Sequence, residues 1–131
     1  MPVGFVATDC SAGLENGVWA VVLGSPSTEE DDFYLMFQKK EGTYTQQDIA
    51  FGWDKPYVEF CGQGWSWYGH MNEVTLERGM IRVIMDGEAA AYMRNDGIIE
   101  VQFAVTDSEF TQLQSTLQEI FNGVEYFNNA G

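Results

Sequence analysis

Residues 57–86, YVEFCGQGWSWYGHMNEVTLERGMIRVIMD, decide the fold. Apolar residues alternate with polar ones along Val74–Glu77 and again along Met80–Met85, which is the period-two pattern of half-buried strands. Arg78 and Gly79 separate the two runs and are typical of a tight turn. The stretch therefore predicts an antiparallel β-hairpin at the centre of a sheet.

An aromatic segment precedes this hairpin. Trp65, Trp67 and Tyr68 lie within four residues of one another, between glycines that suit a sharp link. Three such rings cannot all point inward from one strand, so at least one is expected to be exposed at an edge of the sheet. Exposed Trp and Tyr side chains are typical anchors of protein interfaces.

The remaining strands follow from shorter patterns. Residues 9–17 contain acids and glycines and are predicted to be a link, residues 24–32 are predicted to be a loop, and QQDIAFGW at 46–53 fits either a short strand or one helical turn. The other predicted strands are Val3–Thr8, Val18–Leu23, Phe33–Gln38 and Tyr57–Cys61.

The C-terminal part of the chain predicts helices. GEAAAYM, at 87–93, contains good helix formers for about two turns, and a strand with alternating apolar residues follows it at 99–105. Thr106 and Glu109 have the spacing of a capping box, and apolar residues at helical spacing run from Phe110 to Phe121. The fold class is α+β: one domain, residues 1–131, with a mainly antiparallel sheet and a long C-terminal helix and a short preceding helix on one face.

The net charge is the most unusual feature of the overall composition. Twenty acids and six bases give a formal net charge of −14, and all six bases lie between residues 39 and 94. Such a field repels nucleic acid and anionic membranes and attracts a cationic partner. The alternative is that the acids serve solubility alone. The 45% hydrophobic content excludes disorder.

Catalytic and metal-binding patterns are weak. His70 is the one histidine, and neither Cys61 nor Ser66 has a sequence context that marks it as a nucleophile. One histidine and two distant cysteines cannot form a closed zinc site, and the acids at 29–32 lack the spacing of a calcium loop. We therefore expect no catalytic residue, metal or cofactor.

Localisation is predicted from what the chain lacks. The first ten residues have no basic start for a signal peptide, and VWAVVL is too short for a bilayer span of about 20 residues. Two separated cysteines fit a reducing compartment. These features predict a cytoplasmic protein.

A family resemblance adds what these patterns leave open. The stretches FYLMFQ, QQDIAFG, YVEFCGQGWSWYG, MNEVTLERGMIRVIMDGEAA and IIEVQFAVTDSEFTQLQSTLQEIFNG occur in an order similar to that of the immunity protein 10 family of bacterial polymorphic-toxin systems. The most specific part is the Gln-Gly, Tyr-Gly and Val-x-Leu-x-Arg series between residues 63 and 78. The resemblance implies a cytoplasmic protein that binds and neutralises a cognate toxin without turnover.

The favoured hypothesis is therefore an immunity protein, with a toxin partner that is basic if it acts on nucleic acid. A DNA-mimic inhibitor of a nucleic-acid-binding protein and, third, a small-ligand module or enzyme are the alternatives. The predicted partner-binding residues are Trp65, Trp67, Tyr68, His70, Glu29, Glu30, Asp31 and Asp32.

Overall fold

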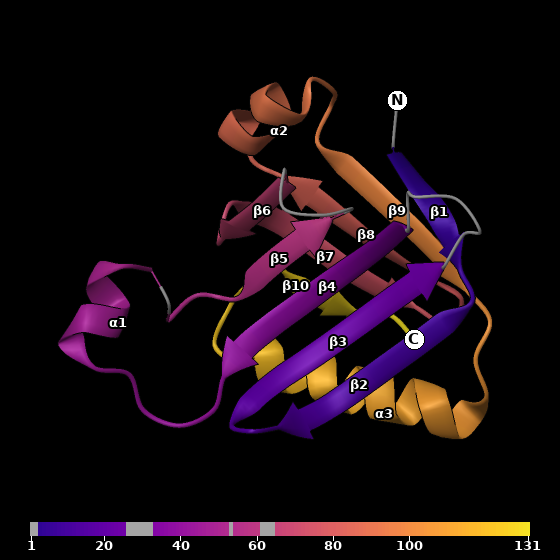
Figure 1. Ribbon diagram of the computed structural model, residues 1–131. Helices are drawn as coiled ribbons and strands as arrows, with labels where there is room; N and C mark the ends of the chain where they lie inside the picture. The colour runs from indigo at the N-terminus through magenta and orange to yellow at the C-terminus, as the bar shows by residue number, and fades with distance from the viewer. Residues whose placement is uncertain (1–2, 26–32, 53, 61–64) are drawn as a thin grey trace.

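The computed structural model describes residues 3–25, 33–52, 54–60 and 65–131 (Figure 1). The strands within these ranges are β1 (Val3–Ala7), β2 (Asp9–Glu15), β3 (Val18–Ser25), β4 (Phe33–Lys40), β5 (Tyr57–Phe60), β6 (Trp65–Tyr68), β7 (Met71–Glu77), β8 (Met80–Met85), β9 (Ile98–Phe103) and β10 (Phe127–Asn129). The helices there are α1 (Gln46–Ala50), α2 (Gly87–Met93) and α3 (Asp107–Ile120).

The strands form two sheets. Sheet A has the order β1-β9-β8-β7-β10, and sheet B has the order β2-β3-β4-β5-β6. Sheet B is antiparallel throughout, whereas β1 runs parallel to β9 and β10 runs parallel to β7 in sheet A. The α+β class with mainly antiparallel strands is confirmed. Alternation along a strand shows which side chains point inward but not which sheet the strand joins, so the division into two sheets was not visible in the sequence.

The predicted hairpin is present as β7 and β8. Val74 lies opposite Val83 and Glu77 lies opposite Met80, which leaves Arg78 and Gly79 as the turn. The inward side chains of both strands are buried in the core. Strand β7 begins three residues earlier than predicted, at Met71, which is itself buried.

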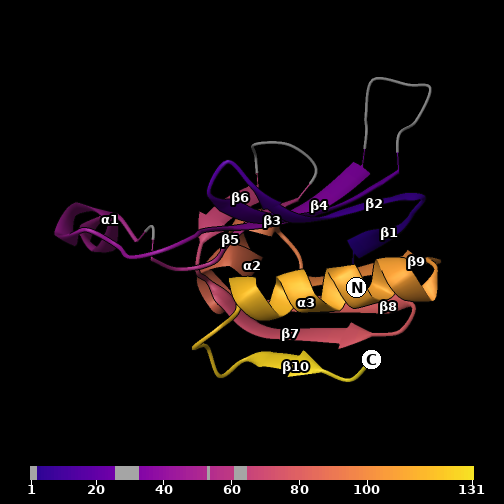
Figure 2. The same cartoon turned by 90° about the horizontal axis from the view of Figure 1, so that it is seen from below.

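Helix α3 closes the space between the two sheets. Its capping box is present: the Thr106 hydroxyl accepts from the Glu109 amide (3.1 Å), and the Glu109 carboxylate accepts from the Thr106 amide (2.8 Å). After the helix, the Phe121 ring contacts Phe37 of sheet B and Phe127 of sheet A, at centroid distances of 5.4 and 5.1 Å. Figure 2 shows α3 between the layers, with sheet B on one side and β7 and β10 on the other. The helix therefore contributes to both halves of one core.

The structure corrects one predicted segment, assigns the segment that was left open and adds β10, which was not predicted. The predicted link at residues 9–17 is wrong for most of its length, because Asp9–Glu15 form β2 and pair with β3 over seven positions. The turn is confined to Asn16 and Gly17, both at positive φ. The segment left open at 46–53 contains α1, which begins at a capping box formed by Thr45 and Asp48.

Candidate functional site

Strand β6 is an edge strand of sheet B, and its side chains alternate between the two faces. Trp65 lies opposite Phe60 and Trp67 lies opposite Val58, so both indoles share the face of two buried residues. Trp65 stacks on Phe60 at 5.6 Å with an interplanar angle of 11°. Both tryptophans are half-buried and pack against the core. Contact of either indole with a partner stays a prediction.

Tyr68 is in a different environment from the two tryptophans. It lies opposite Tyr57 on the outer face of sheet B, with the two ring centroids 4.9 Å apart. Its exposed fraction is 43%, which makes it the exposed ring that the aromatic segment was expected to contain. Trp67 instead meets Tyr92 of α2 edge-on, at 5.9 Å.

His70 connects the end of β6 to the start of α2. Its backbone is in the left-handed region, with φ of 64°, and its Nδ1 lies 2.8 Å from Asp86 Oδ2. Asp86 is also the N-cap of α2: its side chain accepts from the Ala89 amide, at 2.9 Å. The Ala89 amide and the His70 ring hold the pKa of Asp86 below its usual value. These contacts give His70 a role in holding the fold.

The predicted acidic residues Glu29, Glu30, Asp31 and Asp32 lie outside the described residues, as does Cys61. In the part of the chain that the structure describes, no group of three His, Cys, Asp or Glu residues is placed to hold a metal ion. The described ring contacts and ion pair of His70 involve Trp67 and Asp86.

A tyrosine cluster on the outer face of sheet B was not predicted. The hydroxyls of Tyr34 and Tyr57 both donate to the carboxylate of Glu59. Burial, together with the bond to Glu59, raises the pKa of Tyr57. The signal in the sequence was the alternation of these residues with the buried Leu35 and Val58. The cluster surrounds a negative charge with hydroxyl groups and rings.

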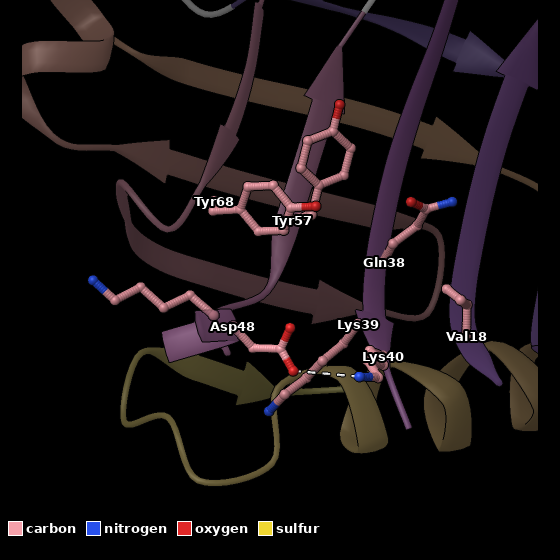
Figure 3. Close-up of a pocket in the computed structure, with 8 residues that line it drawn as sticks. Val18, Gln38, Lys39, Lys40, Asp48, Tyr57 and Tyr68 are labelled. Carbon is pink, nitrogen blue, oxygen red and sulfur yellow. Dashed lines mark hydrogen bonds and ion pairs between the residues drawn. The ribbon is translucent and has the colours of Figure 1, made fainter. Parts of the chain in front are cut away.

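A cationic pocket lies beside this cluster (Figure 3). It has a volume of about 170 Å³, well below the roughly 300 Å³ that a drug-sized ligand requires. Its lining residues are Val18, Gln38, Lys39, Lys40, Asp48, Lys55, Tyr57 and Tyr68. Three of the protein's six basic residues therefore surround one small opening, although the net charge is −14.

The lysines of the pocket have different partners. Lys40 Nζ lies 3.3 Å from Asp48 Oδ2, and Asp48 is fixed in turn by the capping box of α1. Lys39 reaches the carbonyl of Asn122, beyond the end of α3, at 3.4 Å. Lys55 makes no ion pair with any residue that the structure describes, and its side chain lies close to Gly69. The pocket therefore keeps a net positive charge.

Helix α1 flanks the pocket and projects from the body of the protein (Figures 1 and 2). Ile49 and Phe51 are exposed by 56% and 59%. Large apolar side chains on a projecting segment are typical of contact residues. The sequence left the structure of this segment open, so neither residue was predicted to belong to the site.

The fold and this surface define an acidic α+β protein that carries aromatic and cationic side chains on the open side of sheet B. A family model described as Immunity protein 10 matches residues 6–111, and the chain belongs to that family. The resemblance seen in the sequence is thereby confirmed. No curated protein matches the chain. No helix in the described ranges is long and apolar enough to cross a membrane.

Proposed function

We propose that this protein is a cytoplasmic immunity protein that binds one cognate toxin and neutralises it by stoichiometric association, without turnover. The observation that carries the proposal is membership of the immunity protein 10 family over residues 6–111. An immunity protein must recognise one toxin tightly and need not transform it.

The charge of the protein supports this function. A net charge of −14 speeds association with a basic toxin, because long-range attraction raises the encounter rate. Nuclease toxins bind the phosphate backbone and are expected to be basic for that reason. The aromatic segment with His70 is the proposed contact region, and the acids at 29–32 are proposed to steer the toxin toward the protein.

Co-expression with the product of the neighbouring gene tests the proposal. We expect the immunity protein to restore growth to cells that express this toxin, and we expect the two proteins to co-purify in a fixed ratio. In a titration, residual toxin activity should fall linearly and reach zero at that ratio. An unrelated protein of similar size and net charge is the control. Protection at far below the stoichiometric amount would indicate turnover and would contradict the proposal.

A further inference from the structure

The outer face of sheet A carries charged side chains along its central strands. Strands β7, β8 and β9 point Glu73, Glu77, Arg82 and Glu100 outward, opposite the buried residues of the same strands. This distribution is typical of a solvated sheet face. Arg82 and Glu100 also form an ion pair across it, at 2.9 Å.

The part of the outer face of sheet B that β3, β4, β5 and β6 form is mainly apolar and aromatic. The pairing register places its residues in rows across β3, β4, β5 and β6. In the described part of these four strands, its charged residues are Glu59, which Tyr34 and Tyr57 cover, and Lys40 at one end. The other residues that these strands place on it are Val18, Ala20, Val22, Gly24, Met36, Gln38, Ser66 and Tyr68. The edge strand β2 adds Asp9, Ser11, Gly13 and Glu15 along one side.

No described helix covers this face. Figure 1 looks directly onto sheet B, and Figure 2 shows α3 on the opposite side, between the sheets. Among the described residues, no helix lies over the apolar rows of this face, and exposed apolar patches mark sites of protein association. The cationic pocket and the exposed Phe51 of the α1 segment lie at one end of the face.

We propose that the outer face of sheet B is the toxin-docking surface, and that the cationic pocket receives an aspartate or glutamate side chain of the toxin. Apolar residues of the toxin beside this carboxylate lie on Val22 and Met36. The inference rests on the proposed function and adds to it the surface and the chemistry of the contact.

Charge complementarity selects this occupant. Lys40 and Lys55 line the pocket against the single lining carboxylate of Asp48, whereas the ammonium group of Lys39 lies on the other face of β4, at the Asn122 carbonyl. A carboxylate side chain fits a pocket of about 170 Å³, and the hydroxyl of Tyr68, which also lines it, supplies a further donor. The long-range field attracts a basic toxin, whereas one local contact of opposite sign fixes its register. A partner that is basic everywhere cannot satisfy the pocket.

Charge reversal tests the pocket. Lys55→Glu should weaken toxin binding by at least ~10-fold, mainly through faster dissociation. The reason is that the new Glu carboxylate then repels the carboxylate of the toxin. Arg94→Glu is the matched control: it is an exposed site at the end of α2, it changes the net charge equally, and it should leave dissociation unchanged. A melting curve for each variant verifies folding.

The occupant is identified by exchanging charges across the interface. Each acidic residue on the toxin surface is changed to Lys and paired with the Lys55→Glu protein. One such toxin variant should recover at least about half of the lost binding energy and should bind the wild-type protein more weakly. If no toxin variant restores binding to Lys55→Glu, the pocket does not hold a toxin carboxylate.

The sheet face has its own test. Val22→Arg places a long charged side chain at the centre of the outer face of sheet B, and Ile84→Arg makes a comparable change on the outer face of sheet A. Val22→Arg should weaken binding at least ~10-fold, and Ile84→Arg should not. Equal binding by both variants would overturn the docking surface. Failure of the wild-type protein to bind the toxin would instead overturn the proposed function, and the inference with it.

Discussion

Trp67 and Tyr68 are adjacent in the chain but face opposite sides of sheet B. Trp67 packs between the core and Tyr92 of α2, whereas Tyr68 stands beside Tyr57 on the outer face. The two rings should therefore respond differently to truncation, although both belong to the predicted contact segment.

Tyr68→Ala should leave the melting temperature nearly unchanged and should speed dissociation from the toxin by an amount equivalent to about 2 kcal/mol, as expected for an exposed hot-spot ring. Trp67→Ala should lower the free energy of unfolding by about 2 kcal/mol or more, because it removes a half-buried indole. Melting curves and dissociation rates of both variants, and of Trp65→Ala, separate the two roles. A Tyr68→Ala protein with an unchanged dissociation rate would place the interface elsewhere.

The carboxylate of Asp86 stabilises the N-terminus of α2. The Ala89 amide and the His70 ring both stabilise its charged form and lower its pKa in the folded protein. This stabilisation is fully present above the unfolded pKa of about 3.8 and is lost as pH falls through the lower folded value. Asp86→Ala should cost about 1 kcal/mol at neutral pH through loss of the N-cap.

The pH dependence of unfolding checks this prediction. The difference in stability between the wild-type and Asp86→Ala proteins should shrink as pH falls below 3.8. A difference that does not change over this range would show that the carboxylate charge is not what stabilises the cap. When both proteins also carry His70→Ala, the stability difference caused by Asp86→Ala should be only partly reduced. The reason is that the Ala89 amide still donates to Asp86.

At the scale of the element, α3 carries much of the core. Leu117 has no exposed surface, so Leu117→Ala should lower the free energy of unfolding by ~2–5 kcal/mol through lost burial and a residual cavity. Gln118→Ala, on the exposed side of the same helix, is the control and should change stability by less than about 0.5 kcal/mol. Chemical denaturation measures both. A loss below about 1 kcal/mol for Leu117→Ala would contradict the packing of α3.

The elements that the sequence predicted well are those with strong local signals. The β7–β8 hairpin follows from alternation and a two-residue turn, and α3 follows from its capping box and helical spacing. Strand β2 was missed because Asp9, Ser11 and Gly13 are poor strand formers, and because pairing with β3 over seven positions outweighs their local preference.

The candidate site was less predictable than the fold. Alternation indicated that one ring of the aromatic segment is exposed, but the pairing with β5 decides that this ring is Tyr68. The cationic pocket brings Lys40 of β4 and Lys55, which precedes β5, next to the last residue of β6. Such an assembly depends on strand order, which no local pattern encodes.

At the scale of the whole molecule, charge should govern the rate of association. Neutralising Glu29, Glu30, Asp31 and Asp32 to the corresponding amides changes the net charge of −14 by four and should slow association with a basic toxin. It should also flatten the dependence of the association rate on salt, because screening acts on the long-range field. Stopped-flow measurements over a range of ionic strength test this prediction.

The dissociation rate of the same variant provides the control. It should stay close to that of the wild-type complex if these acids steer the toxin without contacting it closely. If the association rate of this variant at low salt equals that of the wild-type protein, the four acids at 29–32 do not contribute to steering.

The pairing of the edge strand β1 has a consequence for when the protein can fold during its synthesis. β1 must pair with β9, from Val3 with Ile99 to Ala7 with Phe103, so residues up to 103 have to leave the ribosome before this pairing is complete. Pairings between such distant segments slow folding, whereas the β7–β8 hairpin needs only local contacts. We expect protection to lag behind translation. The proposed immunity function would then require inhibitor that has already folded when toxin synthesis begins.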